Sequence, residues 1–104
     1  MKTDWQVVAF QEDGMWVAQC LTHDIAAQAN TFEGAIDSLK AIATRYAELA
    51  IAAGKVPFED FEEAPAGFRK MYDDHPRFRV QTTFDLPGGL LPSRLAPAQI
   101  AIAA

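Results

Sequence analysis

The chain has 104 residues, a length typical of one domain with a single core. Half of its residues are hydrophobic and 22% are charged, and this composition excludes a disordered or fibrous chain. The net charge of −5 is uneven: residues 1–63 carry four basic and eleven acidic side chains, and residues 64–104 carry five basic and three acidic ones. The acidic first part argues against a nucleic acid partner and favours a basic protein, unless the charge only keeps a small domain in solution.

Membrane and export signals are missing from the sequence. No apolar run approaches the roughly 20 residues that cross a bilayer, and "MKTDWQ" lacks the basic start and apolar core of a signal peptide. Cys20 is the only cysteine, which excludes an intrachain disulfide and fits a reducing compartment. We therefore expect a cytoplasmic protein that does not contact a membrane.

The first thirty residues have the composition of three short strands. Residues 5–10, "WQVVAF", are β-branched and aromatic, and Asp13-Gly14 then signals a tight hairpin. Residues 15–22 return as a second strand in which both alternate sets of side chains are largely apolar. Residues 25–29 follow the corner at His23 and Asp24 as a third strand. The sequence thus predicts a three-stranded antiparallel meander.

A long amphipathic helix is predicted after the meander. Thr31 is a suitable N-cap, apolar residues recur from Phe32 to Ala53 at helical spacing, and Gly54 supplies the stop. After the acidic connection "VPFEDFEEAP", residues 66–75 predict a short helix and residues 77–84 a half-buried strand. We expect residues 1–86 to form one α+β domain, with the Pro/Gly-rich residues 87–104 as a loosely ordered tail.

The search for catalytic or metal chemistry finds one weak cluster. Cys20, His23 and Asp24 would converge at the end of the second strand, where a metal or a Cys-His nucleophile needs a third positioned group and a cleft. The alternative, which we favour, is a core thiol followed by two turn residues. Zinc-ligand spacings and phosphate-binding glycine loops are absent from the sequence. We therefore predict no enzyme, no catalytic residue, no metal and no cofactor.

The acidic connection has the features of a recognition segment. Its carboxylates alternate with Phe58 and Phe61, so apolar anchors and negative charge lie together, as binding to a basic protein requires. The alternative is that both rings pack back on the long helix. The residues predicted to contact a partner are Glu59, Asp60, Phe61 and Glu62, together with His23 and Asp24 at the corner.

Grouped cations occur only at Arg69, Lys70, Arg77 and Arg79. Phe78 would point away from Arg77 and Arg79, whereas an RNA-binding sheet needs its aromatic rings and its cations on one exposed face. We therefore expect solvated arginines on an edge strand, where they discourage aggregation.

The stretches "VVAFQEDGMWVAQC", "IAAQA" and "NTFEGAIDSLKAIATRYAELAIAAG" resemble the N-terminal domain of the HicB-like antitoxin family over residues 5–58. The resemblance implies a three-stranded meander packed on one long helix, assembly into dimers or larger oligomers, and neutralisation of a small basic mRNA-cleaving HicA-like toxin. The chain departs from the family in "LTHDIAAQ", where a Leu-Pro-Gly corner is usual, and in Gly34, where an acid is usual. No pair of DNA-binding helices follows residues 77–84, so no operator contact is assigned.

The resulting hypothesis is a non-enzymatic, HicB-like protein-binding domain that masks a small basic RNase. Two alternatives stay open: a small enzyme or ligand binder that uses Cys20 and His23, and an RNA-binding domain. We also expect a homo-oligomer, a dimer or larger, because one long and one short helix cannot cover both apolar faces of the second strand and an edge strand.

Overall fold

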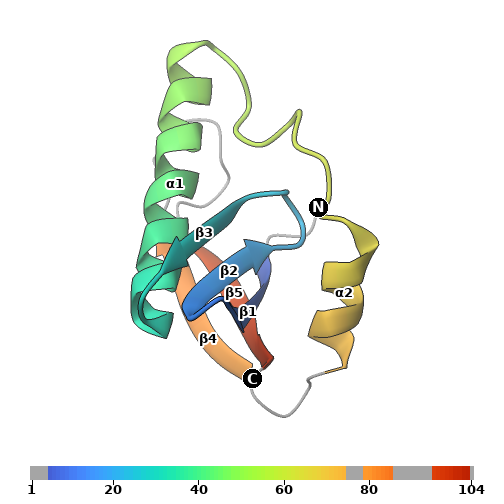
Figure 1. Ribbon diagram of the computed structural model, residues 1–104. Helices are drawn as coiled ribbons and strands as arrows, with labels where there is room; N and C mark the ends of the chain where they lie inside the picture. Colours follow the sequence, from blue (N-terminus) through green and yellow to red (C-terminus); the bar gives the residue numbers. More distant parts are fainter. Residues whose placement is uncertain (1–4, 75–78, 86–94, 104) are drawn as a thin grey trace.

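The computed structural model describes residues 5–74, 79–85 and 95–103. Along the chain the elements are β1 (Trp5–Glu12), β2 (Met15–Cys20), β3 (Ala26–Ala29), α1 (Phe32–Ala52), α2 (Ala66–Asp73), β4 (Arg79–Asp85) and β5 (Leu95–Ala103). The strands form one mixed sheet in the order β3-β2-β1-β5-β4, with α1 and α2 on opposite sides (Figure 1). The α+β class is confirmed. Within the described residues, no helix is both long and apolar enough to cross a membrane.

The meander of β1, β2 and β3 forms as predicted. Asp13 and Gly14 both have positive φ, at 53° and 79°, as a two-residue hairpin of type I′ requires, and Glu12 pairs with Met15 across the turn. Strand β3 then pairs antiparallel with β2, from Gln19 opposite Ala26 to Trp16 opposite Ala29. Local turn chemistry therefore determines this part of the sheet.

Helix α1 begins and ends at the predicted signals. The side-chain oxygen of Thr31 accepts a hydrogen bond of 3.0 Å from the Gly34 amide. At the other end Gly54 has φ 73°, and the Lys55 amide donates back to the Ala50 carbonyl at 2.8 Å. A Cβ atom on Gly34 would lie 2.9 Å from the capping oxygen. Glycine at this position therefore leaves room for the capping oxygen.

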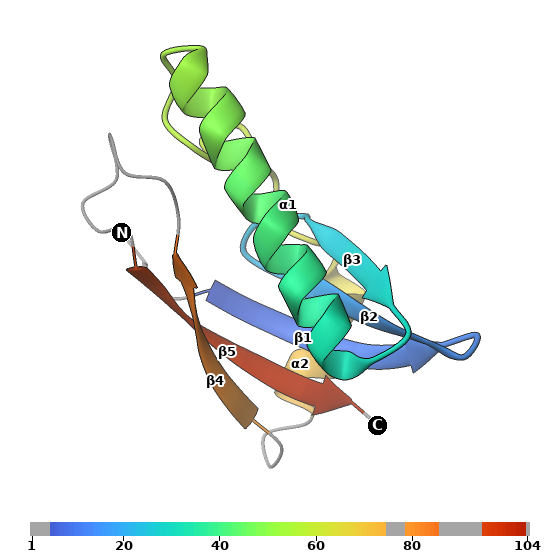
Figure 2. The same ribbon diagram turned by 90° about the vertical axis from the view of Figure 1, so that its left-hand side faces the viewer.

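Residues 95–103 correct the prediction of a loosely ordered tail. They form β5, which lies between β1 and β4 and so is an interior strand of the sheet (Figure 2). It pairs parallel with β1, from Trp5 opposite Ala98 to Phe10 opposite Ala103, and antiparallel with β4. The predicted meander is thus three strands of a five-stranded mixed sheet, and the rest of the expected tail up to residue 94 lies outside the described residues.

The position of Pro97 explains how a proline-containing segment joins the sheet. Proline cannot donate to a strand ladder and is tolerated mainly where a strand lacks one neighbour. Among the described residues, the ladder with β1 runs from Ala98 onward and Pro97 pairs with Thr83 of β4, so Pro97 lies at the margin of the described pairing with β1. After it, Ile100 and Ala101 alternate between the two faces and both are buried.

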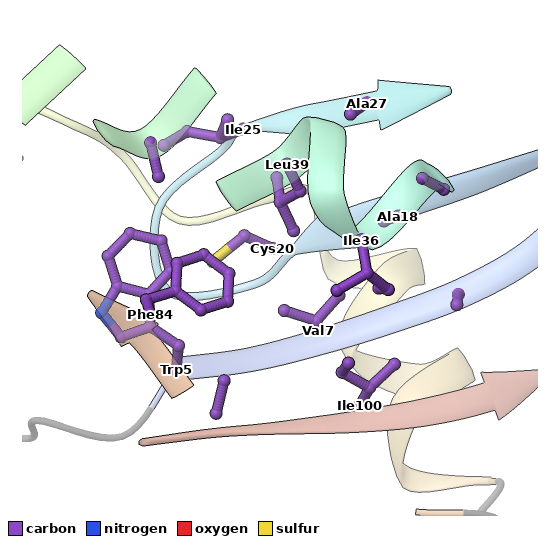
Figure 3. Close-up of a cluster of buried hydrophobic side chains, with 14 of the residues drawn as sticks. Trp5, Val7, Ala18, Cys20, Ile25, Ala27, Ile36, Leu39, Phe84 and Ile100 are labelled. Atoms are coloured by element: carbon purple, nitrogen blue, oxygen red, sulfur yellow. The ribbon is translucent and has the colours of Figure 1, made fainter. Parts of the chain in front are cut away.

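Each face of the sheet carries its own core. The α1 side holds the larger cluster, which includes Trp5, Val7, Cys20, Ile36, Leu39, Phe84 and Ile100 (Figure 3). The α2 side holds Val8, Leu21, Tyr72 and Ala101. Val17 and Gln19, on the second face of β2, are also buried within the single chain, so the expectation of an oligomer loses the reason that the sequence suggested.

Strand β4 lies at the edge of the sheet and is half-buried, as expected, but its described arginine is not solvated. The guanidinium of Arg79 lies 3.9 Å from the centroid of the Tyr72 ring and donates a 3.1 Å hydrogen bond to the Tyr72 carbonyl, so this arginine is packed rather than solvated. Phe84 is buried as expected, whereas Val80 is exposed because α1 lies over the other end of the sheet (Figure 2). Arg77 and Phe78 lie outside the described residues.

Candidate protein-binding site

The corner after β2 is held by one buried polar side chain. Gln19 is 5% exposed, and its side-chain amide donates 2.9 Å hydrogen bonds to the Cys20 carbonyl and to Oδ1 of Asp24. A buried amide with good partners fixes a single local geometry, since leaving it unpaired would be costly. The exposed carboxylate of Asp24 is thus oriented by a side chain from inside the domain.

The acidic connection is fastened to this corner through backbone hydrogen bonds. The Asp24 amide donates to the Glu62 carbonyl at 2.8 Å, and the Ala64 amide donates to the Leu21 carbonyl at 3.0 Å. The structure therefore brings the two predicted groups of contact residues together, His23 and Asp24 from the corner and residues 59–62 from the connection.

The two phenylalanines of the acidic connection pack in an aromatic cluster. Phe58 is 8% exposed and packs edge-on against Trp5 and stacks on the His23 ring, with centroid separations of 5.1 and 4.9 Å. Phe61 is half-buried and contacts the Tyr46 ring of α1 at 5.0 Å. Of the two predicted anchors, Phe58 belongs to the core and Phe61 remains partly accessible beside α1.

The carboxylates of this region all reach solvent, and together they form what we call the acidic surface: Asp24, Glu59, Asp60, Glu62 and Glu63. Within the described residues, the ion pair that forms joins Lys70 to Asp74, on α2. The negative charge of the acidic surface is therefore not neutralised by any described cation, and its field extends about 10 Å into solution at moderate salt.

A shallow hollow of about 490 Å³ borders the acidic surface, between the start of β3 and α1. Its lining residues are Asp24, Ile25, Ala26, Ile42, Arg45, Tyr46 and Leu49. Tyr46 and Leu49 are 45% and 50% exposed, although the sequence pattern placed both on the core side of the helix. The sequence shows that the apolar stripe of α1 is wide, but how much of the stripe the sheet covers is set by the fold.

The geometry around Cys20 and His23 does not favour nucleophilic chemistry. Cys20 is fully buried, and burial raises the pKa of its thiol, an effect that the neighbouring backbone amides offset only in part. Burial lowers the pKa of His23, whose ring contacts Trp5, Phe58 and Phe61. Its Nδ1 has no hydrogen-bond partner within the described part of the chain. A thiol in this setting stays protonated near neutral pH.

We expect Cys20 to react with a small disulfide reagent at least about a hundredfold more slowly in the folded protein than in denaturant. The reason is that the folded domain both covers the sulfur and disfavours the thiolate. Timed absorbance measurements at mildly alkaline pH with and without urea would check this. Equal rates in the two conditions would mean that the thiol is accessible and would restore the nucleophile as a candidate.

Metal and nucleic acid ligands are also poorly matched by the structure. Among the residues described, no three His, Cys, Asp or Glu side chains are grouped to hold a metal ion, and His75 lies outside those residues. Of the grouped cations, Arg69 donates to the Gln6 side chain, Lys70 pairs with Asp74, and Arg79 covers Tyr72. These contacts occupy the basic side chains within the domain, which does not favour a base-stacking platform.

Comparison of the chain with protein-family models, with curated proteins and with solved structures finds no match.

Proposed function

We propose that this chain is a non-enzymatic protein-binding domain whose acidic surface covers a small basic protein. The observation that carries the proposal is the junction between Asp24 and Glu62, which gathers five exposed carboxylates from two distant segments into one surface. Carboxylates held on a rigid corner lose little freedom when they meet a basic partner, and they steer its approach.

The partner that fits this surface and the resemblance to HicB-like antitoxins is a small basic RNase of the HicA-like kind. The mechanism is steric: the acidic surface covers the basic groove through which RNA would enter, and no bond is made or broken. Phe61, half-buried against Tyr46, supplies an apolar contact beside the charges. Neutralisation of an RNA-cleaving toxin rests on this resemblance and on charge complementarity.

The test is capture of the tagged full chain from its own cells, comparing the wild type with the double variant Asp60→Lys, Glu62→Lys. We expect a small basic protein in stoichiometric amount with the wild type and about tenfold weaker binding by the variant, since two reversed charges near an interface together change binding by roughly 1.4 kcal/mol. Binding by the wild type also weakens as salt is raised. The captured protein is then assayed for RNA cleavage with and without this chain.

The matched control is the double variant Glu12→Lys, Asp37→Lys, which makes the same change of charge at exposed positions on β1 and α1. It distinguishes a local surface from a general effect of net charge. Capture that is unchanged by reversal at Asp60 and Glu62, or equally reduced by the control, would remove the acidic surface as the binding site. A captured protein with no RNase activity would remove the antitoxin role.

A further inference from the structure

The outer edge of β3 is a feature of the fold that the proposed function leaves unused. Among the described residues, β3 is the last strand of the sheet and pairs on one side, with β2. The Cys20 amide donates to the Ile25 carbonyl at 2.9 Å, just before β3 begins. Hydrogen-bonded pairs alternate along an antiparallel ladder, so the backbone amides and carbonyls of Ala26 and Gln28 point to the open edge. Two donor–acceptor pairs are thus available to a further strand.

The edge of β3 carries none of the usual protection against pairing. Natural sheets protect their edge strands with charged side chains, with proline or with a bulge. The sequence of β3 is Ala-Ala-Gln-Ala, without a charge or a proline, and its register with β2 is continuous. Ala26 and Gln28 are both exposed, and Ala26 has only a methyl group to shield its backbone. The edge is therefore an open site for an extended chain.

The hollow of about 490 Å³ lies beside the start of this edge, between β3 and α1 (Figure 2). Ile25 and Ala26 line it on the strand side, and its apolar lining on α1 is formed by Ile42, Tyr46 and Leu49. Its volume falls in the range of about 300–1,000 Å³ found for small ligand sites, so it has room for a large apolar side chain. Every second side chain of a strand added along β3 points to the α1 side of the sheet, where the hollow lies.

The charges around the hollow determine which segment fits. Asp24 lines the hollow, its carboxylate is held by Gln19 at 2.9 Å, and its amide bonds to Glu62, so the acidic surface continues directly from the hollow. Arg45 lines the hollow from α1, and within the described residues neither Asp24 nor Arg45 forms an ion pair. A basic side chain is therefore favoured beyond Asp24 and disfavoured in the hollow beside Arg45. The matching segment is apolar along β3 and basic past its start.

We propose that an extended segment of the basic partner protein adds to the open edge of β3 as a sixth strand of the five-stranded sheet, antiparallel to β3. Antiparallel pairing is the more stable arrangement per residue, and it directs the added chain toward the start of β3, so its apolar residues come first and its basic residues follow. The inference rests on the proposed function for the charge of the partner and adds how the partner is held. Backbone hydrogen bonds give affinity, the hollow selects an apolar side chain, and the acidic surface selects the basic end.

Titration of the purified full chain with a short peptide, followed by amide NMR, tests the proposal. In the probe peptide, alternating valines and threonines are followed by three lysines and both ends are blocked; the control peptide has the same residues with the lysines first. The probe should shift the amide signals of Ala26 and Gln28 and slow their exchange with solvent, because both amides become hydrogen-bonded. The control should bind about fivefold more weakly, since its lysines meet Arg45 instead of the acidic surface.

Two variants at Gln28 separate backbone pairing from side-chain contact. Gln28→Pro removes the outward amide and leaves the ladder to β2, because proline is tolerated in an edge strand where its nitrogen faces solvent. It should bind the probe at least about tenfold more weakly. Gln28→Ala is the matched control: it keeps the amide and should bind as the wild type does. Circular dichroism shows that both variants keep their fold.

Asp24→Asn tests the basic end of the segment. The variant keeps an oxygen acceptor for Gln19 and removes the charge, so it should weaken the lysine probe about fivefold and leave unchanged a peptide with serines in place of the lysines. No binding of the probe, equal affinity of the reversed peptide, or full binding by Gln28→Pro would overturn the proposal and leave capture through the acidic surface intact. Failed capture of a partner by a chain that still binds the probe at β3 would overturn the proposed function alone.

Discussion

A chain that ends at Asp85 is expected to lose cooperative folding altogether. Such a truncation removes the interior strand β5, and with it the ladder to β1, the ladder to β4 and the buried side chains of Ala98, Ile100 and Ala101. Domains of this size are stable by only about 5–15 kcal/mol, and the loss of an interior strand exceeds that margin. Thermal unfolding followed by circular dichroism should show no transition, and the amide NMR spectrum should lack dispersion.

Point variants at Ile100 test the contribution of β5 to the core without shortening the chain. Ile100 is 1% exposed between β1 and β4, so Ile100→Asp places an unpaired carboxylate in the α1-side core and should cost more than about 4 kcal/mol. Ile100→Val keeps the shape and should cost about 0.5–1.5 kcal/mol. An Ile100→Asp variant as stable as Ile100→Val would mean that residues 95–103 are the loose tail that their composition suggests.

The sequence predicts the elements whose signals are local. Asp13-Gly14, Thr31 and Gly54 act on their own neighbours, and the structure confirms the hairpin and both ends of α1. Strand β5 escaped prediction because its sequence is rich in alanine and contains Pro97, both unusual in strands. Its place in the sheet depends on parallel pairing with β1, some ninety residues earlier in the chain, and no local pattern carries that information.

The candidate site also combines features that the sequence predicts with features that depend on the fold. Charge and resemblance singled out the corner and the connection separately, but only the bond from Asp24 to Glu62 shows that they adjoin. Gln19 gave no signal, because a glutamine in an apolar strand is ordinary until its carbonyl and carboxylate partners are known. The exposure of Tyr46 was missed for a related reason: helical spacing identifies an apolar face, whereas the width that a sheet covers is a property of the fold.

Phe58 is the second position where a large effect is expected. It is a bulky residue with φ of 65°, a conformation that costs L-residues about 1–2 kcal/mol, and the packing of its ring between Trp5 and His23 keeps it there. Phe58→Ala removes that packing but keeps the strained backbone. We expect it to lower the free energy of unfolding by about 3–5 kcal/mol, measured by urea denaturation.

The matched variant Phe58→Gly separates the two contributions. Glycine adopts positive φ without steric cost, so it should be more stable than Phe58→Ala by about 1 kcal/mol, the reverse of the usual order of these residues. If alanine is the more stable of the two, the backbone at residue 58 is not held in this conformation.

Because Phe58 lies next to Glu59 and Asp60, both variants should also loosen the connection that carries the acidic surface. Weaker partner capture by a variant that still folds would then show that the core beneath the surface positions its charges.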